Sequence, residues 1–347
     1  MRKLITSFCV ATACACALAE SPSSPDSTTL LSISSDVRID WQLDRVNSDT
    51  DNSNTGFNAK FFFLRLDGKI FDCLTYSIRE RLNAVKKDAS FWDATDWVYL
   101  NFATHGWNFQ AGKSTVNIGG WEYDRNPANI FAASVFWNNI NCYQLGGMVS
   151  YSFNSGDSLS MQVCQSPFFT SLNRNLYSYN IMWTGKHGCF KPIWSANLME
   201  YSRGRYISYL ALGNRFELGN LYAEVDFMNR AARHQRFFAA DCSVMTEIGW
   251  KINNRFTVQA KYTYDVNKSN TDADLLVTDG TEINMIGADV EYYPLRKGAH
   301  NLRIHAGCWY SWGRNANSSD LWQDHTLFAS VGITWHMDYL IHKKHAK

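Results

Sequence analysis

The sequence has no apolar run long enough to cross a membrane as a helix. Such a helix needs about 20 predominantly apolar residues, and the longest candidate, Leu4 to Leu18, falls short of that length. A charge excess is missing too, because 33 Lys and Arg stand against 32 Asp and Glu. Binding of nucleic acid needs a strong basic surplus, so we expect no nucleic-acid partner. A membrane role, if there is one, must use strands.

Proline and metal-binding motifs are also scarce. The chain has 6 prolines, and its 9 cysteines form no C-x-x-C pair and no zinc spacing, so we expect neither a metal nor a cofactor. The cysteines that follow the N-terminal segment either pair in an oxidising compartment or serve as small wall residues. We favour the second interpretation for Cys73, Cys142, Cys164, Cys189, Cys242 and Cys308.

The N-terminus has the pattern of an export signal. Two basic residues precede the apolar run, and the small residues Ala17 and Ala19 form an A-x-A cleavage pattern. This predicts that residues 1–19 are removed on export. A lipoprotein is the alternative, because Cys14 and Cys16 lie near the end of the run, although no Leu-rich lipobox precedes them.

What the sequence does have is alternation. Apolar and polar residues alternate along many segments of eight to twelve residues. A period of two is the period of a strand. In 255–266, one face carries aromatic and aliphatic residues and the other carries polar ones. Segments 34–44 and 301–312 repeat the pattern. It predicts sixteen strands, at 34–44, 56–67, 69–82, 94–104, 106–113, 142–153, 157–165, 175–185, 190–202, 204–217, 219–230, 236–251, 254–266, 281–294, 299–312 and 323–336, with the facing of the second and ninth left open.

The connections between these strands alternate in length. Short links such as Asp67-Gly68 and Asn253-Asn254 carry turn residues, whereas the links between them are mostly longer. A transmembrane barrel has short periplasmic turns and long external loops, while a soluble sandwich with an aromatic core, the alternative, gives no reason for this order. We therefore expect an all-β transmembrane barrel in a bacterial outer membrane. It follows a stub at 20–33, occupies 34–336 and precedes a periplasmic tail at 337–347.

The longest connection, at 114–141, joins the fifth and sixth strands and is unusually aromatic. Its apolar side chains need a place to be buried, and a wide barrel offers its lumen. We expect this loop to fold inward and narrow the pore, with the constriction formed by Lys113, Glu122, Asp124 and Arg125. The alternative is that the loop only caps or stiffens the wall, with its charges paired to one another.

This part of the chain resembles a known family. Gly112-Lys113, the run Gly119 to Asp124, and Asn126-Pro127 are similar to a segment of the phosphate-selective porin O and P family, especially its Bacteroidetes-type versions. The resemblance implies a sixteen-stranded barrel, commonly a trimer, with an inward third loop. The motif covers only about thirty residues. The chain also lacks the C-terminal aromatic residue with which such barrels usually end.

The charges expected on the inner wall depart from that family, whose phosphate-selective members carry ladders of Arg and Lys. Here basic and acidic residues are mixed and neither sign dominates, so the resemblance leaves phosphate selectivity open. Such a wall is also consistent with a solvated face that holds cross-strand pairs. The residues predicted to line the pore are Arg38, Asp40, Arg79, Arg81, Lys261, Asp289, Arg303 and His305.

Together these features predict an outer-membrane porin, a passive channel for small hydrophilic solutes or ions, including anions such as phosphate. Its partners would be membrane lipid, the solutes and other copies of the chain in a homotrimer. The alternative is a plugged barrel that acts as an adhesin or receptor through external loops such as 267–280. An outer-membrane hydrolase is disfavoured because the sequence has no G-x-S-x-G motif. We therefore expect no enzymatic activity.

Overall fold

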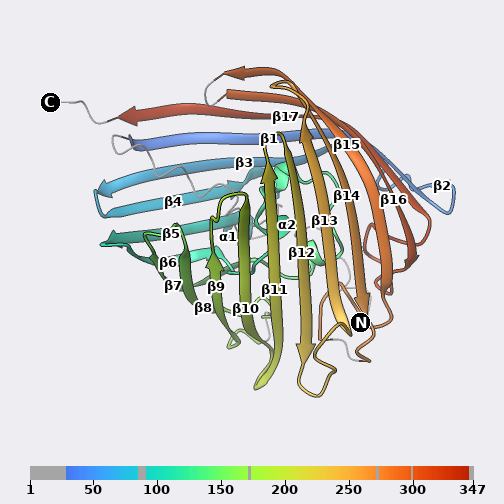
Figure 1. The fold of residues 1–347 in the computed structure, drawn as a ribbon, viewed down its shortest axis with the longest axis horizontal. Coiled ribbons are helices and arrows are strands. Elements are labelled where there is room, and N and C mark those ends of the chain that lie inside the picture. The colour runs from blue at the N-terminus through green and yellow to red at the C-terminus, as the bar shows by residue number, and fades with distance from the viewer. Residues whose placement is uncertain (1–28, 85–90, 171–172, 271–272, 298–299, 344–347) are drawn as a thin grey trace.

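The computed structural model describes residues 29–84, 91–170, 173–270, 273–297 and 300–343, which form one antiparallel sheet closed into a ring (Figure 1). No helix in this described part is long and apolar enough to cross a membrane. The strands are β1 (Thr29–Val46), β2 (Asp49–Thr50), β3 (Gly56–Phe71), β4 (Leu74–Arg81), β5 (Thr95–Thr104), β6 (Trp107–Thr115), β7 (Tyr143–Ser152), β8 (Ser158–Gln165), β9 (Tyr177–Thr184), β10 (Phe190–Ser202), β11 (Arg205–Leu218), β12 (Leu221–Ala232), β13 (Asp241–Lys251), β14 (Phe256–Asn267), β15 (Glu282–Lys297), β16 (His300–Arg314) and β17 (Thr326–Lys343).

Pairing of the first and last long strands closes the ring. β1 pairs with β17 over nearly its whole length, from Thr29 opposite Lys343 to Val46 opposite Thr326. The two-residue β2 is an appendage beside β1, so sixteen strands form the wall. This confirms the expected sixteen-stranded barrel, and closure leaves no strand edge unpaired.

Side chains alternate between the lumen and the outer face as predicted. In β14, Thr257, Gln259 and Lys261 are buried on the inner side, whereas Phe256 is exposed on the outer side. The two strands of uncertain facing are also placed. The second, β3, buries Phe61 and Phe63 inside the barrel, and the ninth, β10, places its buried residues Ile193, Ser195, Asn197 and Met199 on the inner face.

Several predicted boundaries differ from the structure. The turn expected at Asp67-Gly68 lies further along, because β3 continues to Phe71. Gly68 stays in the strand because the Tyr76 ring lies over it, so close that a Cβ there would come within 2.2 Å of the ring. The strand expected from residue 236 begins at Asp241.

The strands of the wall differ in length, and the last strand is longer than expected. Residues 1–28, which include the expected signal peptide, lie outside the described part, and β17 continues to Lys343, past the end expected at 336. β4 to β9 have eight to ten residues, whereas β1 and β17 have 18 each. We call the rim that carries the long connections the loop end and the other rim the turn end.

The six cysteines of the described part are all free thiols. Three are buried and three are exposed. Cys308 lies on the outer face of β16 between Ala288 and Ala329 of the neighbouring strands. Cys164, Cys242 and Cys308 therefore serve as small wall residues, whereas Cys73, Cys142 and Cys189 lie in connections.

A tryptophan on the inner wall packs flat against two glycines. The Trp309 indole covers Gly307 of β16 and Gly287 of β15, and a Cβ on either glycine would lie within 2.1 Å of the ring. Aromatic side chains cover strand glycines in this way and pin the register of neighbouring strands.

We predict that Gly307→Val forces the indole off the wall and lowers the free energy of unfolding by about 1–3 kcal/mol, the usual cost of overpacking. Denaturant titration of the refolded protein in detergent would measure the change. Gly147→Val is the matched control, because the nearest atom to a Cβ at Gly147 is 3.8 Å away. Equal stability of the two variants would contradict the prediction.

Candidate functional site

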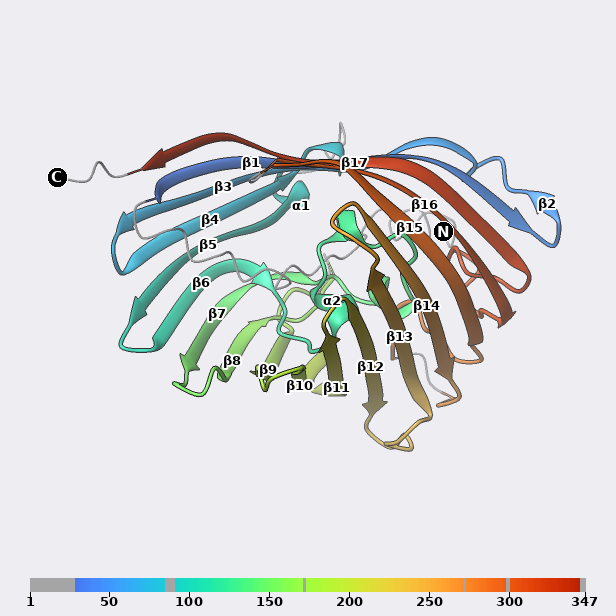
Figure 2. The ribbon, with the colours of Figure 1, turned by 45° about the horizontal axis from the view of Figure 1, so that its top comes forward.

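The connection between β6 and β7, residues 116–142, lies inside the barrel, and we call it the third loop. Figure 2 shows it within the ring, with the short helix α2 (Trp121–Asp124) near the centre. Two turns of 3-10 helix, η2 (Pro127–Asn129) and η3 (Phe136–Asn138), follow. Most of its large apolar side chains are buried, among them Tyr123, Ile130, Phe131, Val135, Phe136 and Trp137. The prediction of an inward third loop is confirmed.

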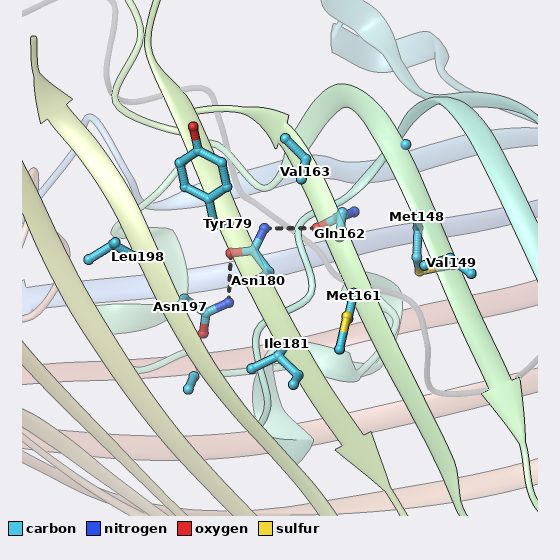
Figure 3. Close-up of a pocket in the computed structure, with 12 residues that line it drawn as sticks. Met148, Val149, Met161, Gln162, Val163, Tyr179, Asn180, Ile181, Asn197 and Leu198 are labelled. Carbon is cyan, nitrogen blue, oxygen red and sulfur yellow. Dashed lines mark hydrogen bonds between the residues drawn. The ribbon is translucent and has the colours of Figure 1, made fainter. Parts of the chain in front are cut away.

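A ladder of side-chain amides holds the beginning of this loop. On β8, β9 and β10, Asn180 donates to Gln162 (3.0 Å) and Asn197 donates to Asn180 (2.8 Å), as Figure 3 shows. The ladder then binds the loop backbone: Gln162 accepts from Asn117 N (2.8 Å), and Asn197 donates to Asn117 O (2.7 Å). Sequence analysis missed this ladder, although three amides at inward strand positions were a signal for it.

Arg125 fastens the middle of the loop to the wall. Its Nη1 donates to Glu247 Oε2 at 2.7 Å, and its Nη2 pairs with Glu224 on the adjacent strand β12. Burial alone would lower the pKa of Arg125, but the carboxylates of Glu224 and Glu247 raise it well above its usual value. The guanidinium is therefore a permanent cation held between two fixed carboxylates.

Glu122 forms a second tie beside Arg125. Its carboxylate pairs with Lys261 of β14 and accepts from Ser134 N (2.9 Å) within the loop. Its own backbone N–H donates to Asp226 of β12 at 2.8 Å. Asp124, the other acidic residue expected at the constriction, is buried in α2. Glu122 and Arg125 therefore serve as wall anchors in this structure.

The tip of the loop reaches the opposite wall. Arg38 of β1 donates to Ile130 O (2.5 Å), and Arg303 of β16 donates to Ala128 O (3.0 Å). The Phe131 ring stacks on the His305 imidazole, with 4.3 Å between centroids, and both guanidinium groups lie over the ring. The loop thus crosses the lumen and is fixed at both sides.

The same residues brace the closing seam of the barrel. Asp40 of β1 accepts from the Arg38 guanidinium (Nε to Oδ2, 2.9 Å) and lies 3.0 Å from His305 Nε2 of β16. The contact passes over Gly332 of β17, where a Cβ would lie 2.2 Å from Asp40 Oδ1. Four predicted pore-lining residues, Arg38, Asp40, Arg303 and His305, therefore form one cluster.

The other predicted residues lie apart from that cluster. Arg79 and Arg81 of β4 share Asp96 of β5, each at 2.9 Å, and Arg79 also lies 3.7 Å from the centre of the Trp97 ring. Asp289 faces the lumen from β15 and is 8% exposed. Among the residues that the structure describes, no hydrogen bond or ion pair of Asp289 occurs.

Lys113 does not join the other residues of the expected constriction. It pairs in register with Val98 and with Leu145, which is exposed on the outer face, so Lys113 also points outward. There its ammonium donates to the carbonyls of Trp92 (2.9 Å) and Thr95 (2.6 Å). Lys113 therefore anchors the connection before β5, and its placement at the pore constriction was wrong.

Two further connections enter the lumen, which the sequence did not predict. Residues 273–281 bury Val277, and Asn139 of the third loop accepts from the N–H groups of Leu276 and Val277. Asp274 pairs with Arg230 of β12 at 2.6 Å. Between β16 and β17, Trp322 donates to the Ala133 carbonyl of the third loop (2.6 Å). The three connections share one apolar core with the wall at the loop end.

Comparisons with known proteins agree with this architecture. Residues 32–189 match the family described as phosphate-selective porin O and P. Three solved structures each cover 88–90% of this chain, at 9–12% identity. They are OmpT of Vibrio cholerae in its trimer form (TM-score 0.61, 100% of that chain), the outer-membrane channel DcaP of Acinetobacter baumannii (0.59, 98%) and an anion-selective porin from Comamonas acidovorans (0.57, 99%).

A search of curated protein sequences gave no match. At identities this low the solved structures establish the fold, and the family match covers the first half of the barrel, including the whole third loop. The expected resemblance is therefore confirmed. The chain is an outer-membrane diffusion channel with a porin fold, and its residues 32–189 are similar to the phosphate-selective porin O and P family.

Proposed function

We propose that the third loop sets the size limit of this channel and that the wall charges give it little preference for phosphate. The observation that carries the proposal is that the loop spans the lumen, from the amide ladder to Arg38 and Arg303. A solute must therefore pass beside the third loop, which is fixed at both sides of the lumen. Its passage is diffusive, and the proposal includes no catalytic step.

The pairing of the inner charges supports weak selectivity. Six of the eight residues proposed to line the pore are cations or histidine, yet Arg38, Arg79, Arg81, Lys261 and Arg303 each have a carboxylate partner. Selectivity in a pore follows wall charges that remain available to the ion. We propose Asp289 as the exception, because its charge has no such partner among the described residues and would favour the passage of cations. The anion preference in the names of the family and of the Comamonas porin is therefore not carried over.

Planar-bilayer recordings of the purified protein test the channel directly. We expect stepwise conductance, a reversal potential near zero in a potassium chloride gradient, and little block of chloride current by added phosphate. Absence of conductance steps would contradict the assignment of the protein as a channel. A strongly anion-selective current that phosphate blocks would contradict the proposed lack of preference.

Exchange of Arg125 tests the role of the loop. Arg125→Glu places a third carboxylate beside Glu224 and Glu247, and loss of a buried ion pair costs about 3–5 kcal/mol, so the loop should detach from β12 and β13. We expect a larger unit conductance and a shift of the reversal potential towards cations. Arg174→Glu, the same charge change at an exposed position of another loop, should leave both values unchanged. An unchanged Arg125→Glu channel would contradict the proposal.

A plugged barrel that acts as a receptor is the second candidate. The apolar core shared by the three inward connections favours it, because that core fills part of the lumen. However, the loop expected to bind a partner, 267–280, buries Asp274 and Val277 within the barrel. Less of it is available to a partner than the sequence suggested. The bilayer recordings distinguish the two candidates, since a plugged barrel would not conduct.

We also propose that the chain assembles as a homotrimer through the wall of β7 to β10. A groove of about 660 Å³ crosses its outer face, lined by apolar side chains that include Met161, Tyr179, Ile181 and Leu198 (Figure 3). β8 and β9 have eight residues each, whereas a tilted membrane strand needs about 9–11. A second copy would shield this thin wall from lipid. The trimer form of the Vibrio cholerae OmpT structure supports this stoichiometry.

Native mass spectrometry of the protein in mild detergent measures the stoichiometry. We expect trimers in the wild type and monomers in Ile181→Glu, because the substitution places a charge in the groove. Val290→Glu, which introduces the same charge on the outer face of β15, is the control and should remain trimeric. A monomeric wild-type protein would contradict the proposal.

A further inference from the structure

Exposed arginines gather on the rim of the barrel at the loop end of β10 to β13. Arg203 and Arg205 lie at the tight turn between β10 and β11, and Arg233 and Arg236 lie in the connection between β12 and β13. All four are exposed, and none forms an ion pair with any residue that the structure describes. Elsewhere in the barrel most cations are paired, so this group is distinct from the lumen wall.

Strand register brings the two connections together. Ile207 of β11 pairs with Ala232 of β12, which places the start of β11 beside the start of the next connection. Figure 1 shows both connections at the lower rim. Lys268, after β14, donates its backbone N–H to Ala240 O (2.6 Å), and its ammonium pairs with Glu282 (2.7 Å).

The connection of residues 233–240 leans over the outer face of the wall and not into the lumen. It covers Asn229, whose side chain donates to Phe237 O (2.6 Å) and accepts from Ala239 N (2.8 Å). The Phe238 ring lies 5.6 Å from that of Phe227. Phe227 alternates with Met228, which belongs to the apolar core inside the barrel, so Phe227 and Phe238 lie on the lipid side.

Two phenyl rings stand exposed beside the arginines. Phe237 is 54% and Phe238 59% exposed. Apolar rings next to cations form the pattern of a membrane interface, where rings enter the acyl boundary and cations meet headgroups. β10, β11 and β12 have 13, 14 and 12 residues, more than the 9–11 or so that span the hydrocarbon, so the rim stands at headgroup height.

We propose that this rim binds the phosphate groups of the glycolipid that forms the outer leaflet of the outer membrane, with Arg203, Arg233 and Arg236 as its main ligands. Guanidinium groups bind phosphate through paired, charge-assisted hydrogen bonds. Phe237 and Phe238 enter the acyl region below the headgroup. The proposal places the loop end at the cell surface and does not depend on whether the lumen conducts.

An electrostatic funnel for anionic solutes is the competing role for the same charges. It would require the arginines to face the pore mouth. The contacts of Asn229 and Phe238 hold the connection that carries Arg233 and Arg236 against the outer wall, whereas Arg205 lies on the inward face of β11 with Ile207 and Tyr209. The lipid side is therefore favoured, and the experiment below separates the two roles.

The test uses the folded full-length barrel in detergent and bisphosphorylated lipid A as the probe, with native mass spectrometry to measure bound lipid. The test variant is R203Q/R233Q/R236Q. The matched control, K186Q/K251Q/R255Q, removes three exposed cations at the turn end. Lipid A without phosphates serves as a second probe, because it would still bind if the contact were only hydrophobic. Free inorganic phosphate serves as a competitor, because it would displace the lipid if the rim captured anionic solutes. Heat-dependent gel mobility verifies that each variant is folded.

We expect the wild type and the control to retain bisphosphorylated lipid A and the test variant to bind it about 100-fold more weakly, as the loss of three interfacial cations implies. Phosphate-free lipid A should bind weakly to all three proteins, and the ion selectivity of the channel should be equal in all three. Unchanged binding by the test variant, or equal binding of phosphate-free lipid A by the wild type, would overturn the proposal. So would competition by millimolar inorganic phosphate together with a selectivity shift, which would identify a funnel.

Discussion

A backbone N–H or C=O group that faces hydrocarbon has no water to bond, so every strand of a membrane wall must be paired on both sides. β1 and β17 meet this constraint by pairing with each other from one end of the barrel to the other. The ring then fixes which side chains point inward, since strand residues alternate. The inward positions of the lumen wall and of the residues that anchor the third loop follow from this closure.

The inner wall uses its charges mainly to hold backbone groups of the third loop. Arg38, Lys261 and Arg303 donate to loop carbonyls, and Asp265 accepts from the N–H groups of Val135 and Phe136. A loop inside a barrel lacks strand partners, so its buried backbone needs such side chains. The mixture of signs on the wall therefore serves both kinds of backbone group, which explains why neither sign dominates.

The sequence predicted the strands well because lipid on one side and a polar interior on the other impose a period of two. It failed where a side chain overrides a local signal, as at Gly68, which Tyr76 keeps within β3. It also misplaced Lys113, because the family motif did not reveal which face of β6 that residue occupies. The inward path of residues 273–281 depends on Asn139 and Arg230, distant partners that no local pattern reveals.

Arg38 has a consequence for how the barrel is assembled. Its guanidinium holds Asp40 at the β1–β17 seam and also the Ile130 carbonyl at the loop tip. The pairing that closes the ring and the anchoring of the loop tip thus share one side chain. A closed barrel with its third loop left outside would leave the buried Arg38 guanidinium without its carbonyl partner, so the closed seam and the inserted loop stabilise each other.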